Sequence, residues 1–120
     1  MPHITLECSS NVEMDFQSFF KELSEKLVAT GHAPKLGMKC RKVISDEFFI
    51  IDGDPHFKMA NLLIRLREGR SKEILTDFSV IGMQLMEKYL QHPIQNKEII
   101  LSTEIRELIK GIDLTSNSIR

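Results

Sequence analysis

Alternating polar and apolar positions open the chain, and helical spacing follows them. Residues 3–8 run His-Ile-Thr-Leu-Glu-Cys, so that every second side chain is apolar, as in a strand with one buried face. Polar residues 9–11 interrupt the pattern. Apolar side chains then recur at helical spacing, at Phe16, Phe19, Phe20, Leu23, Leu27 and Val28. We therefore expect a strand and then a helix over about 16–30, with Asp15 as its N-cap and Gly31 as its C-cap.

Two further strands are predicted in the middle of the chain. Residues 38–51 are rich in Val, Ile and Phe and predict a strand that bends or breaks at Ser45–Asp46. The sequence Asp-Gly-Asp-Pro at 52–55 is typical of a turn. Residues 58–67 then predict a third strand, which ends in a short connection to Ser71.

The second half continues with another helix and another strand. Ser71 can cap a helix whose apolar face is marked by Ile74, Phe78, Ile81, Leu85 and Tyr89. His92–Pro93 is expected to end this helix. Residues 98–107 predict a last strand, and residues 111–120 carry only a weak pattern.

The order strand, helix, strand occurs twice and predicts the fold class. Two βαβ units in succession suggest an α+β domain over residues 1–120, in which a four-stranded sheet carries both helices on one face. The other face of such a sheet would need to be buried elsewhere. Oligomerisation is the simplest way to bury it.

Composition and charge narrow the possible partners. Apolar residues make up 42% of the chain and the net charge is -1, with both signs interspersed. No apolar run is long enough to span a bilayer, and no basic segment precedes an apolar stretch at the start. These features predict a cytoplasmic protein without a nucleic-acid or membrane partner. Cys8 and Cys40 are expected to be reduced, and the four scattered histidines predict no metal site.

Pro2 is the first candidate for chemistry. If the initiator methionine is removed, Pro2 becomes the N-terminus and carries a secondary amine. A free α-amino group titrates near pH 8, roughly two to three units below lysine. Burial or nearby cations lower the pKa further, which would give a neutral base suited to proton abstraction beside a carbonyl. Pro2 could equally be no more than a tolerated second residue, because one residue is not a constellation.

Cationic residues cluster at two strand ends. Lys39, Arg41 and Lys42 begin the second strand, while Arg65, Arg67 and Arg70 lie at the end of the third strand and in the loop after it. Cations brought near Pro2 could hold a carboxylate substrate, stabilise a dienolate and lower the pKa of the amine. Charged runs are more often solvated surface, and this is the interpretation we give to Lys42, Arg65 and Arg67.

Several segments resemble a known family. The stretch Pro2-His3-Ile4-Thr5-Leu6-Glu7-Cys8-Ser9 is similar to the start of 5-carboxymethyl-2-hydroxymuconate delta-isomerases, which belong to the tautomerase superfamily. The resemblance continues, in family order, through residues 29–31, 34–41, 52–53, 69–71 and 101–108. Each segment is weak alone, and together with Pro2 they are fairly specific.

The resemblance implies an activity, a site and an assembly. It implies a homotrimer of duplicated βαβ subunits, with active sites at or near the subunit interfaces. The N-terminal proline acts as general base and then general acid, and converts an enol di- or tricarboxylate of aromatic catabolism to its unsaturated keto isomer without a cofactor. Pro2 matches this base, and Arg70 matches an arginine associated with substrate binding. Arg41 matches an arginine of the family, whereas Lys39 stands where the family has arginine.

The departure at Lys39 leaves the substrate open. Lysine keeps the charge but loses the planar fork of arginine. One alternative is a Pro2-dependent enzyme that acts on a different unsaturated acid, by decarboxylation or dehalogenation. Another is a non-catalytic trimeric module that binds anions in the same pocket. Retention of Met1 would make the Pro2 nitrogen an amide and would favour the second alternative.

Overall fold

The structure is a computed structural model that describes all residues from 1 to 120, and its elements follow the predicted order with two additions. A 3₁₀ turn precedes the second strand, and a short helix separates the second long helix from the last strand. The elements are β1 (His3–Ser9), α1 (Phe16–Ala29), a 3₁₀ turn (Lys35–Gly37), β2 (Lys39–Ser45), β3 (Lys58–Arg67), α2 (Lys72–Tyr89), α3 (Gln91–Gln95) and β4 (Ile99–Leu108).

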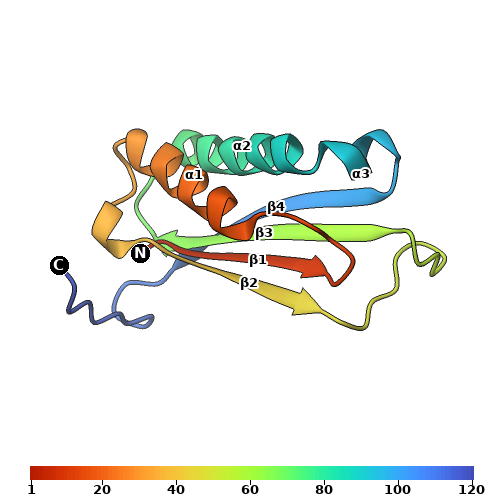
Figure 1. The fold of residues 1–120 in the computed structure, drawn as a ribbon. Helices are drawn as coiled ribbons and strands as arrows, with labels where there is room; N and C mark the ends of the chain where they lie inside the picture. The colour runs from red at the N-terminus through yellow and green to blue at the C-terminus, as the bar shows by residue number, and fades with distance from the viewer.

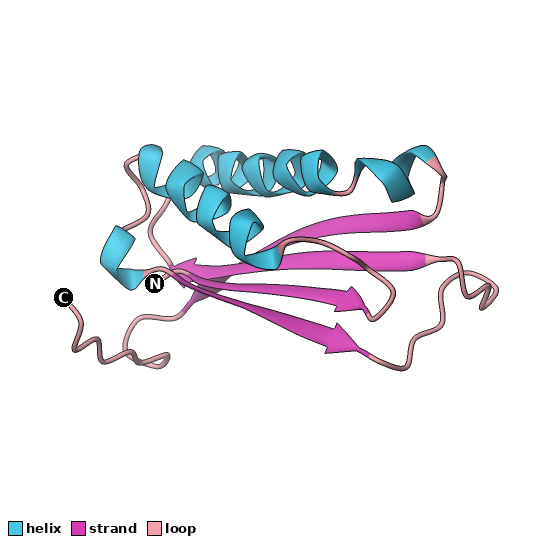
Figure 2. Ribbon diagram, viewed as in Figure 1, coloured by secondary structure: helices cyan, strands magenta, loops and turns pink.

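The four strands form one sheet in the order β2-β1-β3-β4. β1 pairs with β2 in parallel, and β3 pairs with β4 in parallel. The two units join at the centre through the antiparallel pair β1 and β3. Figures 1 and 2 show the helices on one side of this sheet and only strands and loops on the other. The predicted duplicated βαβ fold is therefore confirmed.

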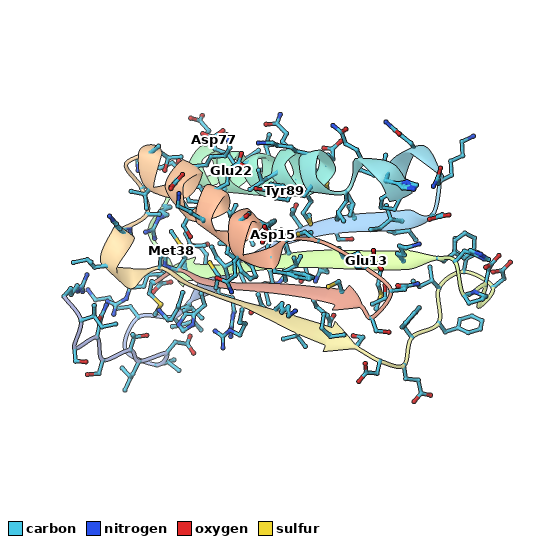
Figure 3. All side chains as sticks on the ribbon, in the orientation of Figure 1. Glu13, Asp15, Glu22, Met38, Asp77 and Tyr89 are labelled. Atoms are coloured by element: carbon cyan, nitrogen blue, oxygen red, sulfur yellow. The ribbon has the colours of Figure 1, made fainter.

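Side-chain caps begin both long helices. The Asp15 carboxylate accepts a hydrogen bond of 3.1 Å from the Ser18 N–H at the start of α1 (Figure 3). The Ser71 hydroxyl oxygen accepts one of 3.3 Å from the Ile74 N–H at the start of α2. The C-cap of α1 is Thr30 and not the predicted Gly31. Gly31 follows it with a φ of 81°, which a residue without a Cβ adopts readily.

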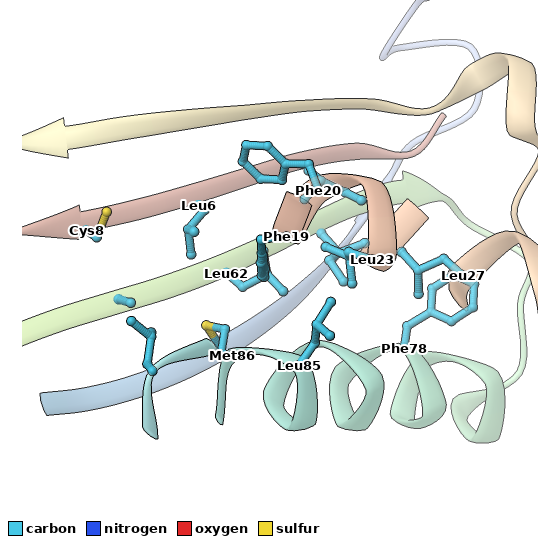
Figure 4. Packing of buried hydrophobic residues seen from close by; sticks show 14 of the residues in the cluster. Leu6, Cys8, Phe19, Phe20, Leu23, Leu27, Leu62, Phe78, Leu85 and Met86 are labelled. Carbon is cyan, nitrogen blue, oxygen red and sulfur yellow. The ribbon is translucent and has the colours of Figure 1, made fainter. Parts of the chain in front are cut away.

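The core lies between the helices and one face of the sheet. Ile4, Leu6 and Cys8 alternate with polar neighbours along β1, and all three are fully buried. They pack with buried residues of the helices and of β3, among them Phe19, Phe20, Leu23, Leu27, Leu62, Phe78, Leu85 and Met86 (Figure 4). Gly82 lets α2 approach the sheet, because a Cβ there would lie 2.7 Å from a methyl carbon of Leu62.

Two predicted boundaries are corrected. The strand predicted over 38–51 ends at Ser45, at the predicted break, but residues 46–51 do not continue it. Its pairing partner β1 ends at Ser9, so nothing remains for residues 46–51 to pair with. The second helix ends at Tyr89 and not at His92–Pro93. Pro93 instead lies in the first turn of α3, where a missing N–H breaks no helical hydrogen bond.

The face of the sheet opposite the helices, which we call the open face, is mainly polar and charged, with apolar side chains at Val43, Met59, Leu63, Ile100 and Leu108. Its side chains include His3, Thr5, Glu7, Lys39, Arg41, Asn61, Arg65, Glu104 and Arg106. Two buried atoms on it, Asn61 Oδ1 and Arg65 Nε, have no hydrogen-bond partner within the chain. None of the helices is long and apolar enough to cross a membrane.

Candidate active site

The sheet topology brings the predicted cations to the N-terminus. β2 runs parallel to β1, so the start of β2 lies beside the start of β1, and His3 pairs with Lys39. β3 runs antiparallel to β1, so the end of β3 lies on the other side, and His3 pairs with Arg65. The two basic clusters thus flank the same chain end, one through parallel and the other through antiparallel pairing.

The N-terminal residue lies against the loop that precedes β2. The Met1 amine donates a hydrogen bond of 3.2 Å to the carbonyl oxygen of Gly37, and Lys39 Nζ donates one of 3.1 Å to the same oxygen. The carbonyl oxygen of Pro2 accepts one of 3.4 Å from the Lys39 N–H. Pro2 itself is buried. Met38 marks this loop in Figure 3.

A cavity of about 260 Å³ opens beside Met1. It is lined by Met1 and Pro34, by Arg67 and Arg70 after β3, and by Thr115, Asn117 and Arg120 near the end of the chain. No aspartate or glutamate side chain lines it, and none of its three arginines forms a salt bridge within the chain. A concave site lined by one sign of charge attracts anions.

This environment changes the protonation of an amine. Burial, followed by the hydrogen bond and charge of Lys39 and then the charges of Arg67 and Arg120, lowers the pKa of the Met1 amine to about 6. An amine with this pKa is mostly neutral at pH 7. The site can therefore provide a nitrogen base at physiological pH, next to cations that would hold an acid substrate.

His3 is neutral for the same reasons. Burial comes first, and the charges of Lys39, Arg65, the amine and Arg41 follow, so that the pKa of His3 falls to about 4. Arg41 Nη2 lies 3.2 Å from His3 Nδ1. Since the imidazole is neutral near pH 7, Nδ1 can accept a hydrogen bond from this guanidinium.

The predicted site residues separate into two groups. Lys39 lies beside the amine and Arg70 lines the cavity. Arg70 is oriented by its own donors, because Nε donates 2.9 Å to the His32 carbonyl oxygen and Nη1 donates 3.0 Å to that of Arg67. Arg41 does not line the cavity and lies with His3 on the open face.

Several residues near the cavity were not predicted from the sequence, or lie in a different environment from the predicted one. Arg67 is exposed, as expected of a surface charge, and it also lines the cavity. Arg65, which was expected to be a surface charge too, is half-buried with its Nε atom covered. Lys42 is exposed as expected, with its Nζ 4.4 Å from the centre of the Phe16 ring. Residues 115–120 have no sequence pattern that indicates a place in the site. Arg67 could have been predicted there, because antiparallel pairing of β1 and β3 brings the end of β3 beside the start of β1.

A second, larger cavity has no unpaired carboxylate that could act in a reaction. It has a volume of about 450 Å³ and lies between α1 and α2. Glu22, its one carboxylate, already accepts hydrogen bonds from Lys88 Nζ at 2.9 Å and from the Tyr89 hydroxyl at 3.0 Å (Figure 3). These groups satisfy one another, so the cavity beside Met1 is the better candidate site.

Known proteins match this chain over nearly its whole length. A family model described as 5-carboxymethyl-2-hydroxymuconate isomerase matches residues 2–120. A 5-carboxymethyl-2-hydroxymuconate Delta-isomerase from Escherichia coli is 26% identical over 121 residues, which cover 99% of this chain and 96% of that protein.

Solved structures share the fold. A 5-carboxymethyl-2-hydroxymuconate isomerase from Deinococcus radiodurans R1 superposes with a TM-score of 0.92 at 23% identity, covering 98% of this chain and 90% of that one. A fused 4-OT wild-type symmetric trimer superposes with a TM-score of 0.72 at 10% identity, covering 95% and 93%. The fold is that of the tautomerases, and the family match over nearly the whole chain shows that this protein belongs to the 5-carboxymethyl-2-hydroxymuconate isomerase family.

Proposed function

We propose that the protein isomerises 5-carboxymethyl-2-hydroxymuconate, or a closely similar enol carboxylate, to its unsaturated keto form, with the amine of Pro2 as base. The family is one of isomerases. The observation that supports the proposed base is the lowered pKa of the amine at this chain end, in a cavity lined by three unpaired arginines. Removal of Met1 would place the Pro2 nitrogen at the same cavity, since Met1 lines it and is bonded to Pro2.

The reaction then needs only one proton carrier. The neutral amine of Pro2 accepts the proton of the enol hydroxyl, and the electrons of that O–H bond move into the conjugated chain to give a dienolate. The protonated amine returns the same proton to a carbon of the chain, which leaves a ketone and a shifted double bond. Lys39 and Arg70 hold the carboxylates and stabilise the negative charge that develops on oxygen.

We also propose a homotrimer in which the open face is covered by neighbouring copies. The buried but unpartnered Arg65 Nε and Asn61 Oδ1 support an assembly, because a polar atom removed from water without a partner costs free energy. Arg41, on the same face, would contact substrate only in a site that adjoins a second subunit. Sedimentation equilibrium tests the assembly, and a monomer at micromolar concentration would contradict it. Cytoplasmic location stays a prediction from the sequence.

The activity is tested by an ultraviolet assay with 2-hydroxymuconate and its 5-carboxymethyl derivative, on protein whose N-terminus has been checked by mass. Loss of dienol absorbance with protein that starts at Pro2, and much slower loss with Pro2→Ala, is the expected result. If protein that starts at Pro2 leaves both compounds unchanged, the proposed substrate class is wrong. If protein that retains Met1 is equally active, the role of the proline amine is wrong.

A further inference from the structure

The end of the chain folds back over the start of the chain. After β4, residues 109–113 turn, with Asp113 Oδ2 accepting a 2.7 Å hydrogen bond from the Ile109 N–H. The following residues, 113–120, which we call the C-terminal segment, form no helix or strand. Figure 1 shows both chain ends on the same side of the molecule, beyond the ends of the strands that flank Met1.

Specific contacts hold the C-terminal segment beside the cavity. Asn117 Nδ2 donates a 2.8 Å hydrogen bond to the carbonyl oxygen of Leu36, and the Thr115 hydroxyl lies 3.7 Å from the sulfur of Met1. The contact with Leu36 does not involve Met1, so it survives removal of that residue. Asn117 is half-buried although its neighbours are exposed, which agrees with a role as the anchor of the segment.

This anchoring places a third guanidinium at the cavity. Arg120 lines it together with Arg67 and Arg70, and none of the three is paired with a carboxylate. A single carboxylate is commonly bound by one arginine through two parallel hydrogen bonds, and at most two guanidinium groups can bind it in this way. Arg70 already has two of its five donors on backbone carbonyls, whereas no hydrogen bond within the chain uses the guanidinium of Arg120 or Arg67. Positive charge thus exceeds what one carboxylate requires.

We infer that the C-terminal segment is part of the substrate site, and that Arg120, with Arg67, binds a second carboxylate on the acid whose first carboxylate is held by Arg70. This inference rests on the proposed function and refines it. Arg120 selects for dicarboxylates and tricarboxylates over monocarboxylates of the same length. Asn117 is a positioning residue that acts through Arg120.

Two ligands of equal carbon number test the inference without any turnover. Muconate and sorbate share a six-carbon diene, but muconate has a carboxylate at both ends and sorbate at only one. The affinity for each acid is measured by calorimetry, on full-length protein that starts at Pro2. The wild-type protein should bind muconate about tenfold or more tighter than sorbate, since a hydrogen-bonded charge pair contributes on that order.

Substitutions assign this preference to the C-terminal segment. Arg120→Ala should weaken muconate binding about tenfold or more and change sorbate binding far less, and Arg120→Lys should restore part of the loss. Asn117→Ala should also weaken muconate binding, by a smaller factor. Arg106→Ala is the matched control, because Arg106 lies outside the cavity and pairs with Glu104; it should leave both affinities unchanged.

Three outcomes would overturn the inference. They are equal affinity of the wild-type protein for the two acids, no binding of either, and equal weakening of both by Arg120→Ala. Failure of the proposed activity is a separate result. If the enol substrates are not turned over but Arg120→Ala removes the preference for muconate, the second carboxylate site stands and the isomerase proposal fails.

Discussion

A Cβ atom on Gly37 would lie 2.6 Å from the carbonyl oxygen of Met1, so the start of the chain packs backbone against backbone on the loop before β2. In the chain that retains Met1, the position of its amine is therefore determined mainly by the main chain, through this contact and the hydrogen bond from the amine to the Gly37 carbonyl oxygen. Pro2 is held to the start of β2 by the main chain as well, since its carbonyl oxygen accepts a hydrogen bond from the Lys39 N–H. Side-chain substitutions around the cavity should therefore change the charge at the Pro2 amine without moving it far. This makes the effects of such substitutions on rate interpretable.

Pro2→Ala should lower kcat/KM toward the enol substrate by roughly two orders of magnitude, within the range found for a general base. An alanine amine at the chain end rotates more freely than the ring nitrogen of proline, so its lone pair is aligned less well with the proton that it accepts. Steady-state kinetics on protein of confirmed N-terminus measure the loss. Thermal unfolding is the control, and a kcat/KM near the wild-type value would remove Pro2 from the mechanism.

Lys39→Met should move the acidic limb of the pH profile of kcat/KM to higher pH, by roughly one unit. Lys39 lowers the pKa of the Met1 amine through its hydrogen bond and its charge. We expect it to act in the same direction on the Pro2 amine once Met1 is removed, and a neutral side chain of similar length removes both effects. The base is then protonated over a wider pH range, so activity near pH 6 falls more than activity near pH 8. An unchanged limb with a uniform loss of rate would contradict this assignment.

Lys39→Arg separates charge from geometry at the same position. The charge is kept, so the acidic limb should stay in place. A guanidinium binds a carboxylate through two parallel hydrogen bonds, so kcat/KM for 5-carboxymethyl-2-hydroxymuconate should rise several-fold if that acid is the natural substrate. No change or a loss would indicate that Lys39 is matched to a different acid.

The fold followed from the sequence because its strands and helices have strong periodic patterns. The alternation in residues 3–8 and 58–67 placed two strands within one residue of their observed bounds, and Asp15 and Ser71 marked the true N-caps. The wrong boundaries lie where tertiary contacts determine the end of an element. Ser45–Asp46 marked a bend or break in the second strand, but the apolar residues up to 51 did not show that β2 stops there, where β1 offers no further backbone to pair with.

The site was predicted only as far as its residues lie on strands or resemble the family. Lys39 and Arg70 lie on either side of the chain end that holds Pro2, because parallel and antiparallel pairing bring the ends of β2 and β3 to it. Arg120 could not be found in this way. Its place depends on the Asn117 contact with a main-chain oxygen 81 positions earlier, and a main-chain acceptor leaves no trace in the sequence.

His3→Gln should make stability less dependent on pH. The folded pKa of His3 is about 4, below the value of 6.5 expected for the unfolded chain, so the unfolded state binds more protons between these values. The free energy of unfolding should fall as pH is lowered from 6.5 to 4, by about 1–2 kcal/mol from this residue after allowance for solvent screening. Urea unfolding at pH 7, 5 and 4 measures the effect, with the exposed His32→Gln as control. A slope that His3→Gln does not reduce would contradict the assignment.

Arg70→Ala should reduce kcat/KM by roughly tenfold to a hundredfold, through both kcat and KM, because the guanidinium binds the substrate and the charge that develops on it. The same change removes two hydrogen bonds to backbone carbonyls, so the free energy of unfolding should also fall by about 1 kcal/mol. Arg70→Lys keeps the charge but not the fork, and should retain an intermediate kcat/KM. Kinetics below the unfolding temperature of each variant separate the two effects. If Arg70→Ala and Arg70→Lys lose stability equally and turn over substrate at the wild-type rate, Arg70 only supports the loop after β3.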